Sequence, residues 1–179
     1  AQLGIQKVEI AGFINNSWDA IMQDSIVFWY DHKDSIKQVI RTKINAFNPQ
    51  YVVSYDAEIG GYGHPEHRIS AELTEQIVKE DGAKQGDSPK MIFQITLTEQ
   101  LERFLVSKTP GYEFSKKLTG SKGLPRPDIA VDLEKYWDIK NEAAQCHQSQ
   151  LKILQRFYIV YPEKSKEMHI KAFSREYYS

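Results

Sequence analysis

One short segment of this chain, the glycine-rich run Gly60–His67 (GGYGHPEH), strongly constrains how the chain can fold. Three of its first four residues are glycines, which reach backbone conformations that other residues avoid. Pro65 suits the first turn of a helix. The preceding segment Tyr51–Tyr55 (YVVSY) is typical of a short buried strand, and apolar residues recur at helical spacing after the run. The run therefore predicts a tight turn between a strand and a helix.

Strand-like and helix-like segments alternate along the chain. This alternation predicts an α/β fold with a mostly parallel sheet, in which ligand sites lie beyond the carboxyl ends of the strands. The glycine-rich run lies at such a position. We expect strands at Lys7–Phe13, Tyr51–Tyr55, Met91–Leu97 and Ile129–Leu133, and an edge strand at His169–Phe173. We expect helices at Ser35–Phe47, from Pro65 onward, at Glu99–Lys108 with Thr98 as its cap, and at Glu134–Gln150.

Composition limits the class of protein. The 179 residues are 41% hydrophobic and 26% charged, which predicts one globular domain over residues 1–179. The formal net charge of -1 gives no electrostatic reason to expect a nucleic acid or an anionic membrane, so we expect a small-molecule partner. The single cysteine, Cys146, excludes an intrachain disulfide and a cysteine-rich zinc site. The lack of a long apolar stretch and of a signal-peptide pattern at Ala1 predicts a soluble protein.

His64 and His67 place two imidazoles three residues apart at the start of the predicted helix. Imidazole is a common zinc ligand, and a catalytic zinc takes three protein ligands and keeps one position for water or substrate. These two histidines cannot complete such a site by themselves. An H-x-x-H pair alone is more often an ordinary pair of surface residues, so the assignment depends on the residues around it.

The run GGYGHPEH resembles a signature of the PIG-L/LmbE-like family of zinc-dependent N-acetylglucosaminyl deacetylases, G-G-Y-G-H-P-D-H, with Glu66 in place of aspartate. Two further stretches resemble the family in the same order. Leu3–Phe13 is similar to the stretch after the family's first long helix, and Val131–Gln150 is similar to its C-terminal block V-D-(I/V)…K…A…H-x-S-Q. The likeness spans most of the chain, and bacterial, bacillithiol-type sugar-amide deacetylases are the nearest comparison.

The resemblance implies a three-layer, Rossmann-like sandwich, a zinc or other divalent metal cofactor, and an amino-sugar substrate. Apart from the resemblance, we expect a cytoplasmic location, with the alternative that a signal peptide preceded Ala1, and we leave a homo-oligomer open. The family's first signature, H-P-D-D, supplies two metal ligands and the general base, and it does not occur in this sequence. The resemblance therefore implies that residues 1–179 form the C-terminal three quarters of the catalytic domain, without its N-terminal strand and helix, and are inactive alone.

The resemblance implies roles for four residues of the run. His67 corresponds to a metal ligand. His64 corresponds to a residue that, as imidazolium, stabilises the oxyanion or protonates the leaving amine. Glu66 either orients His64 or is a solvated carboxylate that favours the helix dipole. Tyr62 either points its hydroxyl toward the oxyanion or packs over the loop.

Four more residues are candidate substrate contacts or supports of the metal site. Lys140 and His147 lie seven residues apart in the predicted helix and would share one face. They either support the metal site or are a solvated lysine and a histidine bonded to backbone. Arg126 and Asp128 lie at the end of an expected long loop, Thr109–Pro127, of a kind that often covers or binds a ligand. They either meet sugar hydroxyls or face water.

Three functions stay open on these grounds. We favour a zinc-dependent hydrolase that uses metal-activated water to remove acetyl from an N-acetylglucosamine-type sugar or glycoconjugate. The alternative is a non-catalytic fragment or sugar-binding module that keeps the fold without a complete metal site. A nucleotide-binding Rossmann-like protein is the third, and the lack of G-x-G-x-x-G or G-x-x-x-x-G-K-S/T after any predicted strand opposes it.

Overall fold

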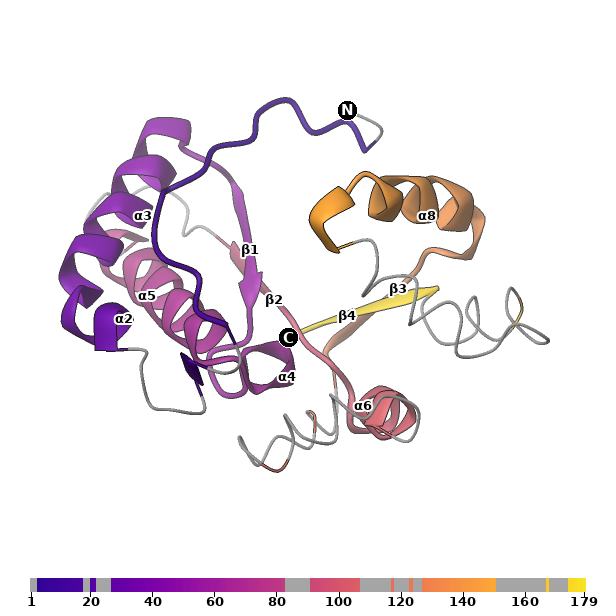
Figure 1. Cartoon of the computed structure of the whole chain (residues 1–179). Helices are drawn as coiled ribbons and strands as arrows, with labels where there is room; N and C mark the ends of the chain where they lie inside the picture. The colour runs from indigo at the N-terminus through magenta and orange to yellow at the C-terminus, as the bar shows by residue number, and fades with distance from the viewer. Residues whose placement is uncertain are drawn as a thin grey trace.

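The computed structural model describes residues 3–17, 20–21, 27–82, 91–106, 117, 123, 127–150, 167 and 174–179. Within these residues the chain forms an α/β structure around one four-stranded sheet (Figure 1). The strands are β1 (Tyr51–Tyr55), β2 (Met91–Ile95), β3 (Ile129–Asp132) and β4 (Arg175–Tyr178). The helices are α2 (Val27–Asp31), α3 (Lys33–Phe47), α4 (Gly60–Gly63), α5 (Pro65–Gly82), α6 (Glu99–Val106) and α8 (Trp137–Gln145), with 3-10 turns η1 (Glu134–Tyr136) and η2 (Gln148–Gln150).

The sheet is mixed, with the strand order β1-β2-β4-β3. β1 and β2 are parallel, in a register that pairs Tyr51 with Met91 and Tyr55 with Ile95. β4 lies between β2 and β3 and is antiparallel to both. The mostly parallel, three-layer arrangement expected from the sequence is therefore not confirmed. A mixed sheet of this kind arises when one strand, here β4, enters antiparallel to its neighbours, and alternation along the sequence does not reveal it.

Helices α3 and α5 pack against each other, and α5 also contacts β1 and β2 (Figure 1). The buried side chains at their contact are Ile36 of α3 with Ile69 and Leu73 of α5. Phe13, Trp29 and Ile40 pack around them. Helical spacing places these apolar residues on facing sides, and their burial removes apolar surface from water. This cluster anchors the beginning of α5, where His67 lies.

Helix α3 begins earlier than the sequence suggested. Its N-cap is His32, whose side chain makes no capping hydrogen bond, and the predicted cap Ser35 lies in the first turn. The helix starts early because α2 leads almost directly into it, so backbone groups of the preceding turn take the place of a side-chain cap. The predicted end at Phe47 is confirmed, and Asn48 closes the helix in the left-handed conformation with a φ of 47°.

The N-terminal segment, residues 3–17, forms no regular strand, so the strand predicted at Lys7–Phe13 is wrong. No described strand forms a ladder with this segment, and Val8 and Ile10 are largely exposed. In Figure 1 the indigo segment runs across α3 and α5 toward α4. Phe13 attaches it to the helical core, and the Trp29 indole donates a hydrogen bond to the Ile14 carbonyl at 2.7 Å. The segment is thus held by a few side chains and not by a backbone ladder.

The C-terminal elements agree with the sequence in part. Strand β2 ends two residues earlier than predicted. The predicted cap of α6 is confirmed, because the Thr98 hydroxyl accepts a hydrogen bond from the Leu101 N–H at 3.2 Å. The single helix predicted over Glu134–Gln150 is instead η1, α8 and η2, with a break at Cys146. The strand predicted at His169–Phe173 and nearly all of the loop predicted at Thr109–Pro127 lie outside the described residues.

Among the helices of the described part, none is long and apolar enough to cross a membrane.

Candidate functional site

Asp56, the residue directly after β1, organises the glycine-rich turn. Its side chain is 2% exposed, and its two carboxylate oxygens accept three backbone hydrogen bonds. Oδ1 accepts from the N–H groups of Ile59 at 2.5 Å and Gly60 at 3.2 Å, and Oδ2 accepts from Gly61 at 2.8 Å. Sequence reasoning missed this residue. The available signal was an aspartate at the end of a strand shortly before a glycine pair, a pattern typical of side-chain-stabilised turns.

The turn requires glycine because it combines left-handed backbone with close packing. Gly60 and Gly61 have φ values of 72° and 76°. A Cβ on Gly60 would lie 2.7 Å from the backbone nitrogen of Arg68, and one on Gly61 would lie 3.1 Å from the ring of Tyr55. The turn therefore passes directly against the first turn of α5 and the end of β1. This close approach brings the carbonyl of Gly60 to the side chain of His67.

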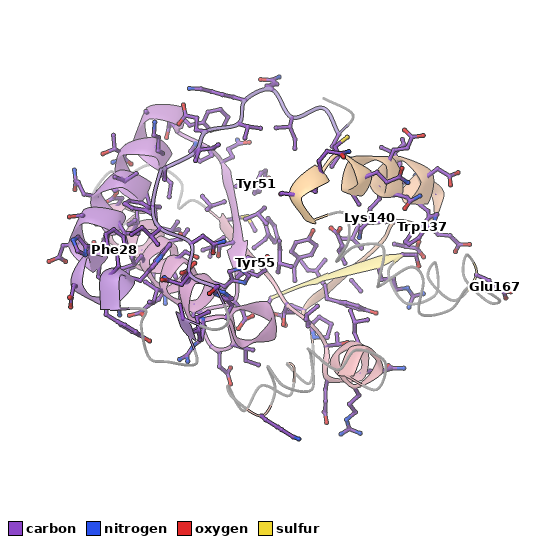
Figure 2. All side chains as sticks on the ribbon, in the orientation of Figure 1. Phe28, Tyr51, Tyr55, Trp137, Lys140 and Glu167 are labelled. Atoms are coloured by element: carbon purple, nitrogen blue, oxygen red, sulfur yellow. The ribbon has the colours of Figure 1, made fainter. Side chains whose placement is uncertain are left out.

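The His67 ring is enclosed by three neighbours. It stacks on the Tyr55 ring with a centroid distance of 4.1 Å and an interplanar angle of 4°. The His64 ring lies on it at 4.8 Å and 28°. Its Nδ1 lies 3.3 Å from the carbonyl oxygen of Gly60. The structure thus brings together His64 and His67, as the sequence predicted, at the carboxyl end of β1 (Figure 2 labels Tyr55).

The surroundings favour neutral imidazoles. The pKa of His67 is lowered from 6.5 to about 4, chiefly by burial and next by repulsion from His64, while the hydrogen bond with the Gly60 carbonyl opposes the shift. Burial also lowers the pKa of His64, against the attraction of Glu66. A neutral His67 can serve as a metal ligand. The imidazolium form expected for His64 is not the form that its burial favours at neutral pH.

Glu66 is 5% exposed, and its partner is a residue of the N-terminal segment. Oε1 of Glu66 accepts hydrogen bonds from the backbone N–H of Asn16 at 2.7 Å and from Asn16 Nδ2 at 2.6 Å. Glu66 is therefore not a solvated first-turn carboxylate. Burial lowers the pKa of His64, and the negative charge of Glu66 opposes that shift. Asn16 was not found from the sequence, because it is 50 residues away from Glu66.

The other predicted residues divide into described and undescribed ones. The side chains of Tyr62 and Arg126 lie outside the described part of the structure. Asp128 is exposed, and its backbone N–H donates to the Tyr178 carbonyl at 2.9 Å. Lys140 binds Glu176 of β4, with Nζ 2.8 Å from Oε1. Figure 2 shows Lys140 on α8, apart from Tyr55 at the end of β1.

Lys140 and His147 do not share a helical face as predicted. Helix α8 ends at Gln145, and His147 lies beyond the break at Cys146, where it is exposed. The prediction assumed a continuous helix from Glu134, and the chain instead turns at Cys146, whose N–H donates to the Ala143 carbonyl at 3.1 Å. His147 therefore lies outside the helix that carries Lys140.

The fit of a metal ion depends on the donors that the described residues offer. Within those residues no group of three His, Cys, Asp or Glu side chains is arranged to hold a metal ion. Among the described residues, His67 has surroundings that would suit a metal ligand. Its neutral ring is oriented by the Gly60 carbonyl and the Tyr55 ring. The described residues do not form a metal site by themselves.

Comparison with known proteins finds two similar curated enzymes. The chain is similar to 1D-myo-inositol 2-acetamido-2-deoxy-alpha-D-glucopyranoside deacetylase of Gordonia bronchialis, with 28% identity over 120 residues, or 64% of this chain and 42% of the relative. It is also similar to the enzyme of the same name from Actinosynnema mirum, with 30% identity over 117 residues, or 63% of this chain and 40% of the relative. The chain spans about two fifths of the length of these curated relatives. No family model and no solved structure matches it.

Proposed function

We propose that this protein is an N-deacetylase that removes the acetyl group from an N-acetylglucosamine-type sugar or glycoconjugate, with zinc or another divalent ion as cofactor. The observation that carries the proposal is the pair of stacked histidines, His64 and His67, on a glycine turn at the carboxyl end of β1. Two relatives whose names describe deacetylation of a glucosamine–inositol conjugate support it.

His67 is proposed to be one metal ligand, with the other ligands outside the described residues. A bound divalent ion would lower the pKa of its water and polarise the substrate amide. The chain's own contribution is a neutral imidazole. The Gly60 carbonyl holds Nδ1, and the Tyr55 ring restrains the tilt of the imidazole. Such support of a ligand from a second layer commonly affects metal affinity by about 10–100-fold.

His64 is proposed to stabilise the oxyanion that forms when the amide carbonyl is attacked. A neutral imidazole still carries one N–H donor, so this role does not require the imidazolium. Glu66 favours positive charge on His64 and thus assists any proton that His64 takes up during the reaction. Tyr62 is proposed to point toward the same oxygen, and Arg126 and Asp128 to meet sugar hydroxyls.

Two substitutions test this division of roles in the protein made from its complete coding sequence. His67→Ala should remove bound zinc and deacetylation together, because a ligand is lost. His64→Ala should retain zinc and lower kcat by roughly 100-fold, as expected for loss of one oxyanion donor. Zinc content and the release of acetate from N-acetylglucosamine conjugates are the measurements. His32→Ala, which changes an exposed histidine at the start of α3, is the control and should alter neither.

The outcomes separate the proposal from its alternative. Loss of zinc from both variants alike would make His64 a ligand and contradict the assigned roles. Binding of the amino sugar without zinc uptake and without release of acetate would instead favour the sugar-binding module. Finding neither zinc nor sugar binding would refute both.

A further inference from the structure

The peptide group between Gly60 and Gly61 connects the buried Asp56 carboxylate to His67. Its N–H, on Gly61, donates to Asp56 Oδ2 at 2.8 Å. Its carbonyl oxygen, on Gly60, lies 3.3 Å from His67 Nδ1. One planar peptide group is therefore hydrogen-bonded to the Asp56 carboxylate through its N–H and to the His67 imidazole through its carbonyl oxygen. From this arrangement we infer that Asp56 is a positioning residue that holds His67 in one tautomer and one orientation.

The tautomer follows from the partner of His67. A carbonyl oxygen can only accept a hydrogen bond, so a neutral His67 bonded to Gly60 must carry its proton on Nδ1. The lone pair is then on Nε2. Histidine side chains in water favour the opposite tautomer, with the proton on Nε2. The structure therefore assigns to His67 the tautomer that solution does not favour, and something in the protein must stabilise it.

Asp56 supplies that stabilisation in two ways. First, a carboxylate that accepts the Gly61 N–H polarises the amide and concentrates negative charge on the Gly60 oxygen, which strengthens the bond to His67. Second, Oδ1 holds the N–H groups of Ile59 and Gly60, so the amide cannot rotate away from the ring. The carboxylate is 2% exposed, so little water competes for these bonds. Tyr55 stacks on His67 and fixes the plane of its ring.

The inference deepens the proposed function, because the Nδ1-protonated form presents Nε2 to a metal. It does not depend on turnover for its test. The tautomer can be read in the metal-free chain by long-range correlation of the ring protons with the two ring nitrogens in histidine labelled with nitrogen-15. The spectrum should be recorded at neutral pH, where the lowered pKa leaves His67 uncharged.

We expect the wild-type spectrum to show His67 protonated on Nδ1. Asp56→Asn keeps the side-chain shape but removes the charge and replaces one acceptor oxygen by a donor group. The ratio of the Nδ1-protonated to the Nε2-protonated form should then fall by about fivefold, which corresponds to the net contribution of one ordinary hydrogen bond. In a zinc titration, the Asp56→Asn variant should bind zinc more weakly than the wild-type protein.

Asp81→Asn is the matched control. Asp81 is another buried acid, 9% exposed, but it lies near the end of α5 and pairs with Arg41 Nε at 3.3 Å. This variant should lose stability and leave the His67 tautomer unchanged. A folded Asp56→Asn protein with the wild-type tautomer ratio would overturn the inference, and so would an equal change in Asp81→Asn.

The wild-type protein alone keeps the inference testable if Asp56→Asn fails to fold. An Nε2-protonated His67 in the wild-type spectrum would overturn it directly. Failure of the proposed function looks different. A protein that shows the expected tautomer and its dependence on Asp56, but releases no acetate when loaded with zinc, would refute the deacetylase and leave the role of Asp56 intact.

Discussion

Glu66 and Asn16 form the closest long-range polar contact of the candidate site. Both hydrogen bonds from Asn16 reach the same oxygen of Glu66, and the carboxylate is almost fully buried. A buried carboxylate that loses its donors would bear the cost of desolvation without compensation. Asn16 therefore joins the N-terminal segment to the first turn of α5 and sets the orientation of the Glu66 side chain beside His64.

We predict that Asn16→Ala lowers the free energy of unfolding by about 1–2 kcal/mol, because a buried charged acceptor loses the Nδ2 donor, while the backbone N–H of residue 16 remains. Most of this loss should vanish in a Glu66→Ala background, where there is no acceptor to leave unsatisfied. Urea denaturation of the two single variants and the double variant gives the coupling energy, which should be about 1 kcal/mol. Asn15→Ala, at the exposed neighbouring asparagine, is the control and should have little effect. Additive effects of Asn16→Ala and Glu66→Ala would contradict the coupling.

At the level of elements, the turn α4 requires positive φ angles, which residues with a Cβ atom adopt only at a cost in free energy. Its glycines lie in the left-handed region, and a Cβ on Gly60 would also meet the backbone of α5 at Arg68. Gly12, in the N-terminal segment, has a similar φ of 77°, but a Cβ added there would meet no atom within 4 Å. Comparing an alanine substitution at Gly60 with one at Gly12 therefore separates the free-energy cost of the backbone conformation from the cost of steric crowding.

Gly60→Ala should be considerably more destabilising than Gly12→Ala. Each variant meets a conformational cost of about 1 kcal/mol, and Gly60→Ala adds about 1–3 kcal/mol for overpacking against Arg68. Urea denaturation midpoints measure both. Equal effects of the two substitutions would mean that the turn is free to move away from α5, and would weaken the account of how Gly60 reaches His67.

For the whole molecule, the buried His64 and the half-buried His67 make stability depend on pH. His67 has a pKa of about 4 in the folded chain and an ordinary value of 6.5, and burial shifts the pKa of His64 in the same direction. Between these values the unfolded chain binds more protons, so stability rises with pH. The contribution is fully present above 6.5 and is lost as the pH falls toward 4. Among the described residues the carboxylates with lowered pKa are Glu9, Glu80 and Glu176, and they lose their contribution only below their ordinary value of 4.5.

The free energy of unfolding should therefore fall as the pH is lowered from 6.5 toward 4.5, a range that reports mainly on the histidines. His67→Gln should flatten this dependence, because the group that must remain neutral is gone. His147→Gln, which changes an exposed histidine, should leave the slope unchanged. Urea denaturation at a series of pH values provides the measurement. A slope that persists in His67→Gln would assign the pH dependence to other groups.

Local patterns in the sequence determined the parts of the fold that depend on neighbours along the chain. The strand Tyr51–Tyr55, the start of α5 at Pro65 and the Thr98 cap were predicted correctly. These features rest on side-chain periodicity and on hydrogen bonds within a few residues, so the necessary information is contiguous. The pairing of His64 with His67 was predictable for the same reason, since both lie on one turn.

Only the tertiary structure decided which distant groups meet. The bonds from Asn16 to Glu66, the antiparallel entry of β4 between β2 and β3, and the failure of Lys7–Phe13 to become a strand all depend on partners far away in the chain. A strand needs a ladder partner, and a buried carboxylate needs donors, whatever their position in the sequence. The residues of the turn determined that His67 lies beside its glycines, whereas three-dimensional packing decided that the Tyr55 ring covers it and that burial keeps it neutral.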